Sequence, residues 1–116
     1  MSDSRFQIAR PRIFLGESLS IGPGKIALLR KIDEMRSITA AAKALGIPYK
    51  RAWSLIETLN VGFNRPVVQT SSGGKGGGGA IVTELGHDLI ARYEALENTL
   101  SVTTAASLDA FNDLLT

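Results

Sequence analysis

The sequence contains no cysteine and a single histidine, His87, among its 116 residues. Without cysteine the chain can form neither disulfides nor thiolate metal sites, and no thiol can act as a nucleophile. One histidine leaves little from which to build a zinc site or a catalytic triad. The acidic pairs Asp33–Glu34 and Glu94–Glu97 fall on predicted helices, where carboxylates are usually solvated. We therefore expect neither an enzyme nor a metal centre, and a surface or interface role for His87.

Long apolar runs are also absent. No segment approaches the ~18 apolar residues of a membrane-spanning helix, and the opening residues, MSDSRFQIARPRIF, lack the order of a secretory signal. The hydrophobic fraction of 44% is that of a globular chain. A length of 116 residues allows one domain with a modest core. These features predict a cytoplasmic protein that makes no contact with a membrane.

The net charge is small, only +2, but it is unevenly distributed. Of the 13 lysine and arginine residues, all but Arg92 lie at or before Lys75. Acidic side chains gather after Gly79 instead, at Glu84, Asp88, Glu94, Glu97, Asp109 and Asp113. A basic first part and an acidic last part suggest that the first part meets phosphate.

Three helical patterns follow one another closely in the first half of the chain. Residues Lys25–Arg36 place Ile26, Leu29, Ile32 and Met35 on one face. A second helix is predicted to begin near Ser37 or Thr39, either of which can cap it, and to stop at Gly46. The segment IPYKRAWSLIETLN then predicts a third helix with Ala52, Ile56 and Leu59 buried and Leu55 beside them. Two helices joined by so short a turn form a helix-turn-helix.

Short β-type runs flank these helices. FQIARPRIFL, residues 6–15, predicts an edge strand interrupted by Pro11, and SIGPG, residues 20–24, predicts a turn. RPVVQT and AIVT predict a hairpin around a glycine tract. The predicted fold is therefore mainly α with a small β wing: a winged helix-turn-helix with a long C-terminal helix.

The glycine tract, in TSSGGKGGGGAIVT, is costly because glycine loses the most conformational freedom on folding. At the tip of a wing it would let backbone N–H groups approach and donate to phosphate oxygens. Ser71 and Ser72 would add hydroxyls, Lys75 a charge and Gly76 a close backbone approach. The alternatives are a solvated loop and a nucleotide phosphate loop. A nucleotide phosphate loop requires the pattern GxxxxGK[ST]. Here Gly76 follows Lys75 in place of serine or threonine, and Gln69 occupies the position of the first glycine.

A recognition helix enters the major groove through its N-terminal residues. Arginine and lysine can contact guanine, and serine or tyrosine can hold a phosphate or a base edge. The predicted DNA-binding residues of the helices are Thr39, Tyr49, Lys50, Arg51 and Ser54. The plainer interpretation is that Lys50 and Arg51 only solvate a helix face. Trp53 is ambiguous, since it could pack in the core or place its ring edge near the sugar-phosphate surface.

The last predicted helix begins after a cap at Thr83 and carries a long apolar stripe. A stripe longer than a three-helix core requires suggests a partner helix, and a two-fold dimer would pair two recognition helices. The predicted dimer interface consists of Leu85, Leu89, Tyr93, Leu96 and Leu100. The alternative is that this helix packs on its own domain. We expect a DNA-binding domain over residues 1–83 and a helical dimerisation segment over residues 84–116.

Two segments together resemble the N-terminal DNA-binding domain of the ModE family of molybdate-responsive transcriptional regulators, which is related to that of LysR-type regulators. They are SITAAAKALGIPYKRAWSLIETLN and VVQTSSGGKGGGGAIVTELGHDLIARYEALE, within roughly residues 25–97. PYKRAW resembles the family's recognition segment, and GGKGGGGA in the wing is the most specific part of the resemblance.

This resemblance implies a homodimer that binds double-stranded DNA and regulates transcription, as a repressor of molybdenum-related genes. It places Tyr49, Lys50, Arg51 and Ser54 at the groove and Lys75 with its glycines in the wing. ModE regulators sense molybdate through C-terminal domains, for which a chain ending at Thr116 has no room. We therefore expect no cofactor in this chain. An adaptor that uses the same fold to bind a protein in place of DNA is the alternative.

Overall fold

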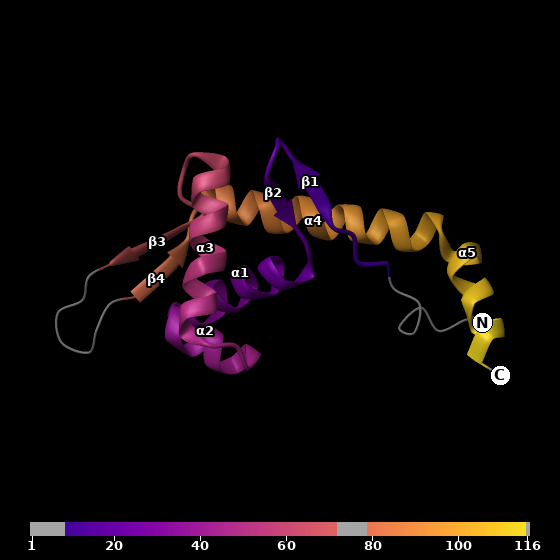
Figure 1. Ribbon diagram of the computed structural model, residues 1–116, viewed down its shortest axis with the longest axis horizontal. Coiled ribbons are helices and arrows are strands. Elements are labelled where there is room, and N and C mark those ends of the chain that lie inside the picture. The colour runs from indigo at the N-terminus through magenta and orange to yellow at the C-terminus, as the bar shows by residue number, and fades with distance from the viewer. Residues whose placement is uncertain (1–8, 72–78, 116) are drawn as a thin grey trace.

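The computed structural model of the chain describes residues 9–71 and 79–115. Residues 6–8 of the predicted edge strand lie outside this range, as do the wing residues Ser72, Lys75 and Gly76. Within the described residues, helices dominate and two small antiparallel hairpins accompany them (Figure 1).

The first hairpin pairs β1 (Ile13–Leu15) with β2 (Leu19–Ile21). The predicted edge strand is thus shorter than expected, and Pro11 precedes it. The predicted turn over residues 20–24 is wrong, because Ser20 and Ile21 belong to β2 and the chain turns at residues 16–18, where Gly16 has φ 60°. Leu19 and Ile21 alternate with Ser20 so that both apolar side chains are buried, and this burial outweighs the turn composition.

The three central helices are α1 (Pro23–Met35), α2 (Ile38–Leu45) and α3 (Tyr49–Phe63), which confirms the predicted helix-turn-helix. The Ser37 hydroxyl accepts the Ala40 N–H at 3.0 Å and so caps α2, and Gly46 ends it with φ 69°. The predicted face of α1 needs one correction. Met35 is exposed because α1 ends there, whereas Leu28 is fully buried beside Leu29.

The wing consists of β3 (Val68–Ser71) and β4 (Gly79–Val82), with Val68 opposite Val82 and Ser71 opposite Gly79. Its outer edge is not free, since the Ala80 N–H donates to the Arg36 carbonyl at 3.1 Å. Strand β4 therefore lies between β3 and the end of α1. Figure 1 shows the wing projecting from the side of the domain on which α1 ends and α2 begins.

Helix α4 (Glu84–Thr103) runs along the longest dimension of the molecule (Figure 1). The Thr83 hydroxyl caps it by accepting the Gly86 N–H at 3.2 Å, and donates to the Pro66 carbonyl at 2.8 Å. Two short elements follow, α5 (Ala105–Asp109) and the 3₁₀ helix η2 (Ala110–Leu115). None of the helices in the described part of the chain has the length and hydropathy to cross a membrane.

The core lies where α1, α2, α3 and the two hairpins meet. The fully enclosed Ala41 and Ala52 let α2 and α3 approach closely, and Ile56 and Leu59 fill the space beneath them, as the α3 pattern predicted. The first half of α4 covers α1, with Leu85, Leu89 and Ile90 packed against the core.

Two polar side-chain contacts join α1 to α4 at the surface. Arg30 pairs with Glu94 and His87 with Asp33, both at 2.8 Å. Exposed pairs of this kind stabilise a fold by only about 0–1 kcal/mol each. The position of α4 therefore depends on apolar packing more than on these charges, and His87 serves an interhelical surface contact.

Candidate nucleic-acid interface

The first two turns of α3 separate sharply into a buried and an exposed face. Ala52 and Ile56 are enclosed by the core, which fixes the rotation of the helix. The predicted contact residues Tyr49, Lys50, Arg51 and Ser54 are all exposed. The ion pairs found among the described residues leave Lys50 and Arg51 without an acidic partner. The helix thus presents two uncompensated cations and two hydroxyls at its N-terminal end.

Trp53 joins this exposed face. Its side chain is 37% exposed and meets Tyr49, one turn earlier, edge to face at a ring-centroid distance of 6.2 Å. Tyr49 is itself 51% exposed. Of the two positions considered for Trp53, the structure favours the surface. The aromatic pair thus lies beside the two cations on the exposed face of α3.

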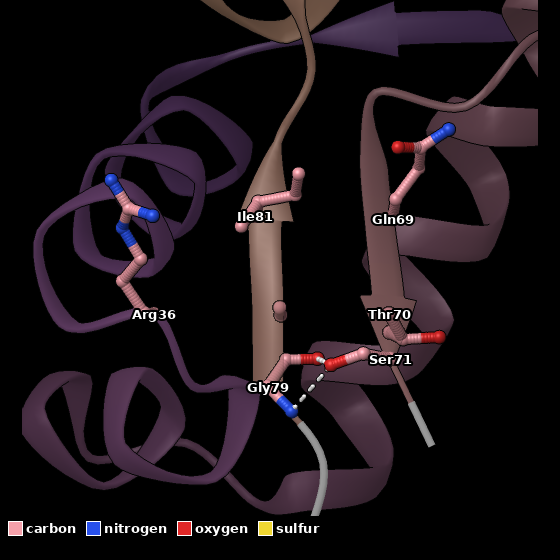
Figure 2. Close-up of a pocket in the computed structure, with 7 residues that line it drawn as sticks. Arg36, Gln69, Thr70, Ser71, Gly79 and Ile81 are labelled. Atoms are coloured by element: carbon pink, nitrogen blue, oxygen red, sulfur yellow. Dashed lines mark hydrogen bonds between the residues drawn. The ribbon is translucent and has the colours of Figure 1, made fainter. Parts of the chain in front are cut away.

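Thr39 and Ser71 lie on the elements next to α3. Thr39 is in the first turn of α2 with its side chain exposed. Ser71 ends β3, and its hydroxyl accepts the Gly79 N–H at 3.1 Å (Figure 2). That hydroxyl is therefore already engaged inside the hairpin. The other predicted wing residues, Ser72, Lys75 and Gly76, fall outside the described residues.

An open hollow lies at the root of the wing, and we call it the wing-root hollow. It is lined by Arg36 at the end of α1 and by residues of both wing strands: Gln69, Thr70, Ser71, Gly79, Ala80 and Ile81 (Figure 2). The site residues predicted from the sequence did not include Arg36, Gln69 or Thr70. Only the cationic character of Arg36 could have drawn attention to it, because nothing in its local sequence shows that β4 returns to this point.

The predicted dimer residues divide into two groups along α4. Leu85 and Leu89 pack against the core of their own chain. Tyr93 is only 2% exposed, and its hydroxyl donates to the Pro11 carbonyl at 2.5 Å. Burial, and to a lesser degree the charge of Glu97, raises the pKa of Tyr93, so the hydroxyl stays a donor. Tyr93 therefore has no surface to offer a partner, which corrects its predicted place in the interface.

The second group lies further along α4. Leu96 is exposed and Leu100 is half-buried. Beyond them, Val102, Phe111, Leu114 and Leu115 are all more than 60% exposed. The alternative considered from the sequence, that the helix packs on its own domain, thus describes the first half of α4, and the apolar surface begins past Tyr93.

Curated proteins similar to this chain include three bacterial relatives. The chain is 42% identical to the DNA-binding transcriptional dual regulator ModE of Escherichia coli K12 over 82 residues, which are 71% of this chain and 31% of that protein. It is 38% identical to the transcriptional regulator ModE of Haemophilus influenzae over 87 residues, 75% of this chain and 34% of that protein. It is 44% identical to the molybdenum-pterin-binding protein MopB of Rhodobacter capsulatus over 77 residues, 66% of this chain and 28% of that protein.

The chain contains a ModE-like winged helix-turn-helix domain. The match spans about a third of the length of these relatives. No protein-family model matches the chain.

Solved structures agree with the fold of this ModE-like domain. The structure of a CbnR DNA-binding domain in complex with DNA has a TM-score of 0.59 at 16% identity, covering 75% of this chain and 94% of that one. The LysR-family regulator VV2_1132 has a TM-score of 0.52 at 22% identity, covering 72% of this chain and 27% of that one. At such low identity these likenesses concern the fold alone.

Proposed function

We propose that this chain is a sequence-specific regulator of transcription that binds double-stranded DNA as a homodimer and represses molybdenum-related genes. The observation that carries the proposal is the exposed, cationic N-terminal face of α3 in a ModE-like domain. The regulatory role is supported by the similarity to ModE transcriptional regulators, and the link to molybdenum by the similarity to the molybdenum-pterin-binding protein MopB.

The contacts in this proposal divide by chemistry. Arg51 and Lys50 extend from the first turn of α3, where a recognition helix meets base edges, and a guanidinium can hold guanine O6 and N7 together. Tyr49, Ser54 and Thr39 offer hydroxyls to phosphates. The Trp53 ring, fixed against Tyr49, lies against the sugar-phosphate surface. The Ser71 hydroxyl, engaged with Gly79, contributes by shaping the wing.

Ser72, Lys75 and Gly76 complete the proposed phosphate contacts at the wing. We expect Lys75→Ala to weaken binding to all duplexes alike and to reduce the slope of log K against log salt by about one unit for each half-site, because each protomer then releases one fewer counterion. The measurement is fluorescence anisotropy with a labelled duplex across a salt series. Arg65→Ala, which removes an exposed charge past the far end of α3, is the matched control and should leave the slope unchanged. An unchanged slope for Lys75→Ala would remove this side chain from the phosphate contacts.

The proposed dimer uses the apolar surface of residues 84–116 beyond Tyr93. Leu96→Asp is expected to yield a monomer, because a charge buried between two helices has no compensating partner. Asn98→Asp adds the same charge to an exposed position roughly opposite on α4 and should stay dimeric. Light scattering gives the mass of both variants. If Leu96→Asp keeps the mass of the wild type and that mass is a dimer, the interface lies elsewhere.

A further inference from the structure

We infer that Arg36, at the wing-root hollow, binds a phosphate of the DNA backbone and so holds the duplex between the helix-turn-helix and the wing. This inference rests on the proposed DNA-binding function and adds a contact to it. Arg36 is neither in the recognition helix nor at the wing tip, where the sequence pattern placed the contacts.

The backbone of Arg36 is fixed on two sides. It ends α1 with φ 56° and ψ 31°, and its N–H donates to the Ile32 carbonyl at 2.7 Å. Its own carbonyl accepts the Ala80 N–H from β4 at 3.1 Å. The side chain of Arg36 therefore starts from a fixed point beside the wing. Figure 2 shows it beside β4, on the side of that strand away from β3.

The conformation of Arg36 is one that glycine adopts most easily. Within the described residues, the two non-glycine positions with positive φ are Arg36 and Asn64. Asparagine tolerates this region because its short amide can bond locally, whereas arginine has no such advantage. A long cationic side chain kept in a strained conformation points to a use for that side chain.

Among the residues that the structure describes, no ion pair engages Arg36. The two acidic residues nearest in sequence are engaged elsewhere, since Asp33 pairs with His87 and Glu34 pairs with Lys31. The rest of the hollow offers the neutral polar side chains Gln69 and Thr70 and the apolar Ile81. A guanidinium on an open surface, with no acidic partner in the described part of the chain, suits a phosphate oxyanion.

The position also fits a duplex. The residue after Arg36 is Ser37, the cap of α2, and Thr39 follows in the first turn of the same helix. The wing projects on this side (Figure 1), so Arg36 stands between α2 and the hairpin. A duplex that meets both α3 and the wing passes this point with its backbone.

Arg36→Gly is the informative variant, because glycine relieves the strained φ while removing the charge. We expect the variant to unfold at the same temperature as the wild type or higher, and to reduce the salt slope of duplex binding by about one unit for each half-site. Its affinity deficit relative to the wild type should therefore shrink about 3.5-fold for each half-site between 50 and 200 mM salt. Arg36→Lys, which keeps the charge, should retain the slope.

Two controls separate this inference from its alternatives. Arg65→Gly removes a charge from an exposed position past the far end of α3, about 20 Å from its first turn, and should leave the slope unchanged. Arg51→Ala reports on the recognition helix itself.

If Arg51→Ala weakens binding while Arg36→Gly binds as the wild type does, the inference about Arg36 is wrong and DNA binding stands. If the wild type binds no duplex, the proposed function fails first. If Arg36→Gly lowers the unfolding temperature and leaves the salt slope unchanged, the charge of Arg36 only stabilises the C-terminal end of the α1 dipole. The inference about a phosphate contact is then wrong.

Discussion

Gly86→Ala should destabilise the domain by about 1–3 kcal/mol and lower its melting temperature by roughly 5–15 °C. Gly86 is in the first turn of α4 and is buried. An added Cβ would lie 2.5 Å from the Val67 carbonyl oxygen and 2.5 Å from Cγ1 of Val82. Because one of these atoms belongs to the backbone, the clash is relieved only if α4 moves away from the wing.

Thermal unfolding followed by circular dichroism measures this effect, and Gly24→Ala is the matched control. Gly24 is also in the first turn of a helix, but an added Cβ there meets nothing within 4 Å. Its replacement should leave the domain as stable or raise stability by about 0.4–1 kcal/mol, because alanine restricts the unfolded chain. If Gly86→Ala is as stable as Gly24→Ala, the close packing of α4 on the wing is not as described.

Arg51→Ala should weaken binding to the preferred site by about 1–3 kcal/mol for each half-site and relax the preference for one base pair. The physical reason is the exposed, unpaired guanidinium in the first turn of α3. A base contact is lost only for the correct sequence, so non-specific affinity should fall much less. This pattern differs from that of a phosphate contact, which weakens all sequences alike.

The measurement is a comparison of Arg51→Ala with the wild type on the preferred duplex and on a scrambled duplex. Arg65→Ala, at the opposite end of α3, is the control for the loss of one positive charge. Equal losses on both duplexes would move Arg51 to the phosphate contacts. Unchanged affinity on both would mean that Arg51 only solvates the helix.

The helices were predictable because their signals are local. Ser37 and Gly46 mark the ends of α2, Thr83 marks the start of α4, and the spacing of Ala52, Ile56 and Leu59 fixes the buried face of α3. In each case the residue interacts with neighbours within one or two helical turns, so the local sequence is sufficient to predict the helix end or the buried face.

The sequence predictions were wrong where contacts between residues far apart in the chain determine the structure. The proline and glycines at residues 22–24 indicate a turn, yet Leu19 and Ile21 form a strand because α3 and the core cover them. Tyr93 continues an apolar stripe, but a carbonyl 82 residues earlier engages its hydroxyl. The wing-root hollow likewise depends on β4 returning to Arg36, 44 positions before Ala80. Periodicity along one helix contains none of this information.

The central claim is that the chain binds a specific DNA sequence as a dimer. The most direct measurement is selection of bound duplexes from a random pool by the purified chain, at two salt concentrations, with and without molybdate. We expect enrichment of an inverted repeat whose half-sites lie about 10 base pairs, or a multiple, apart. Any difference between the molybdate arms would show a response of this chain to the anion. No enrichment, with weak binding that vanishes as salt rises, would contradict the claim and favour a domain that binds a protein partner instead.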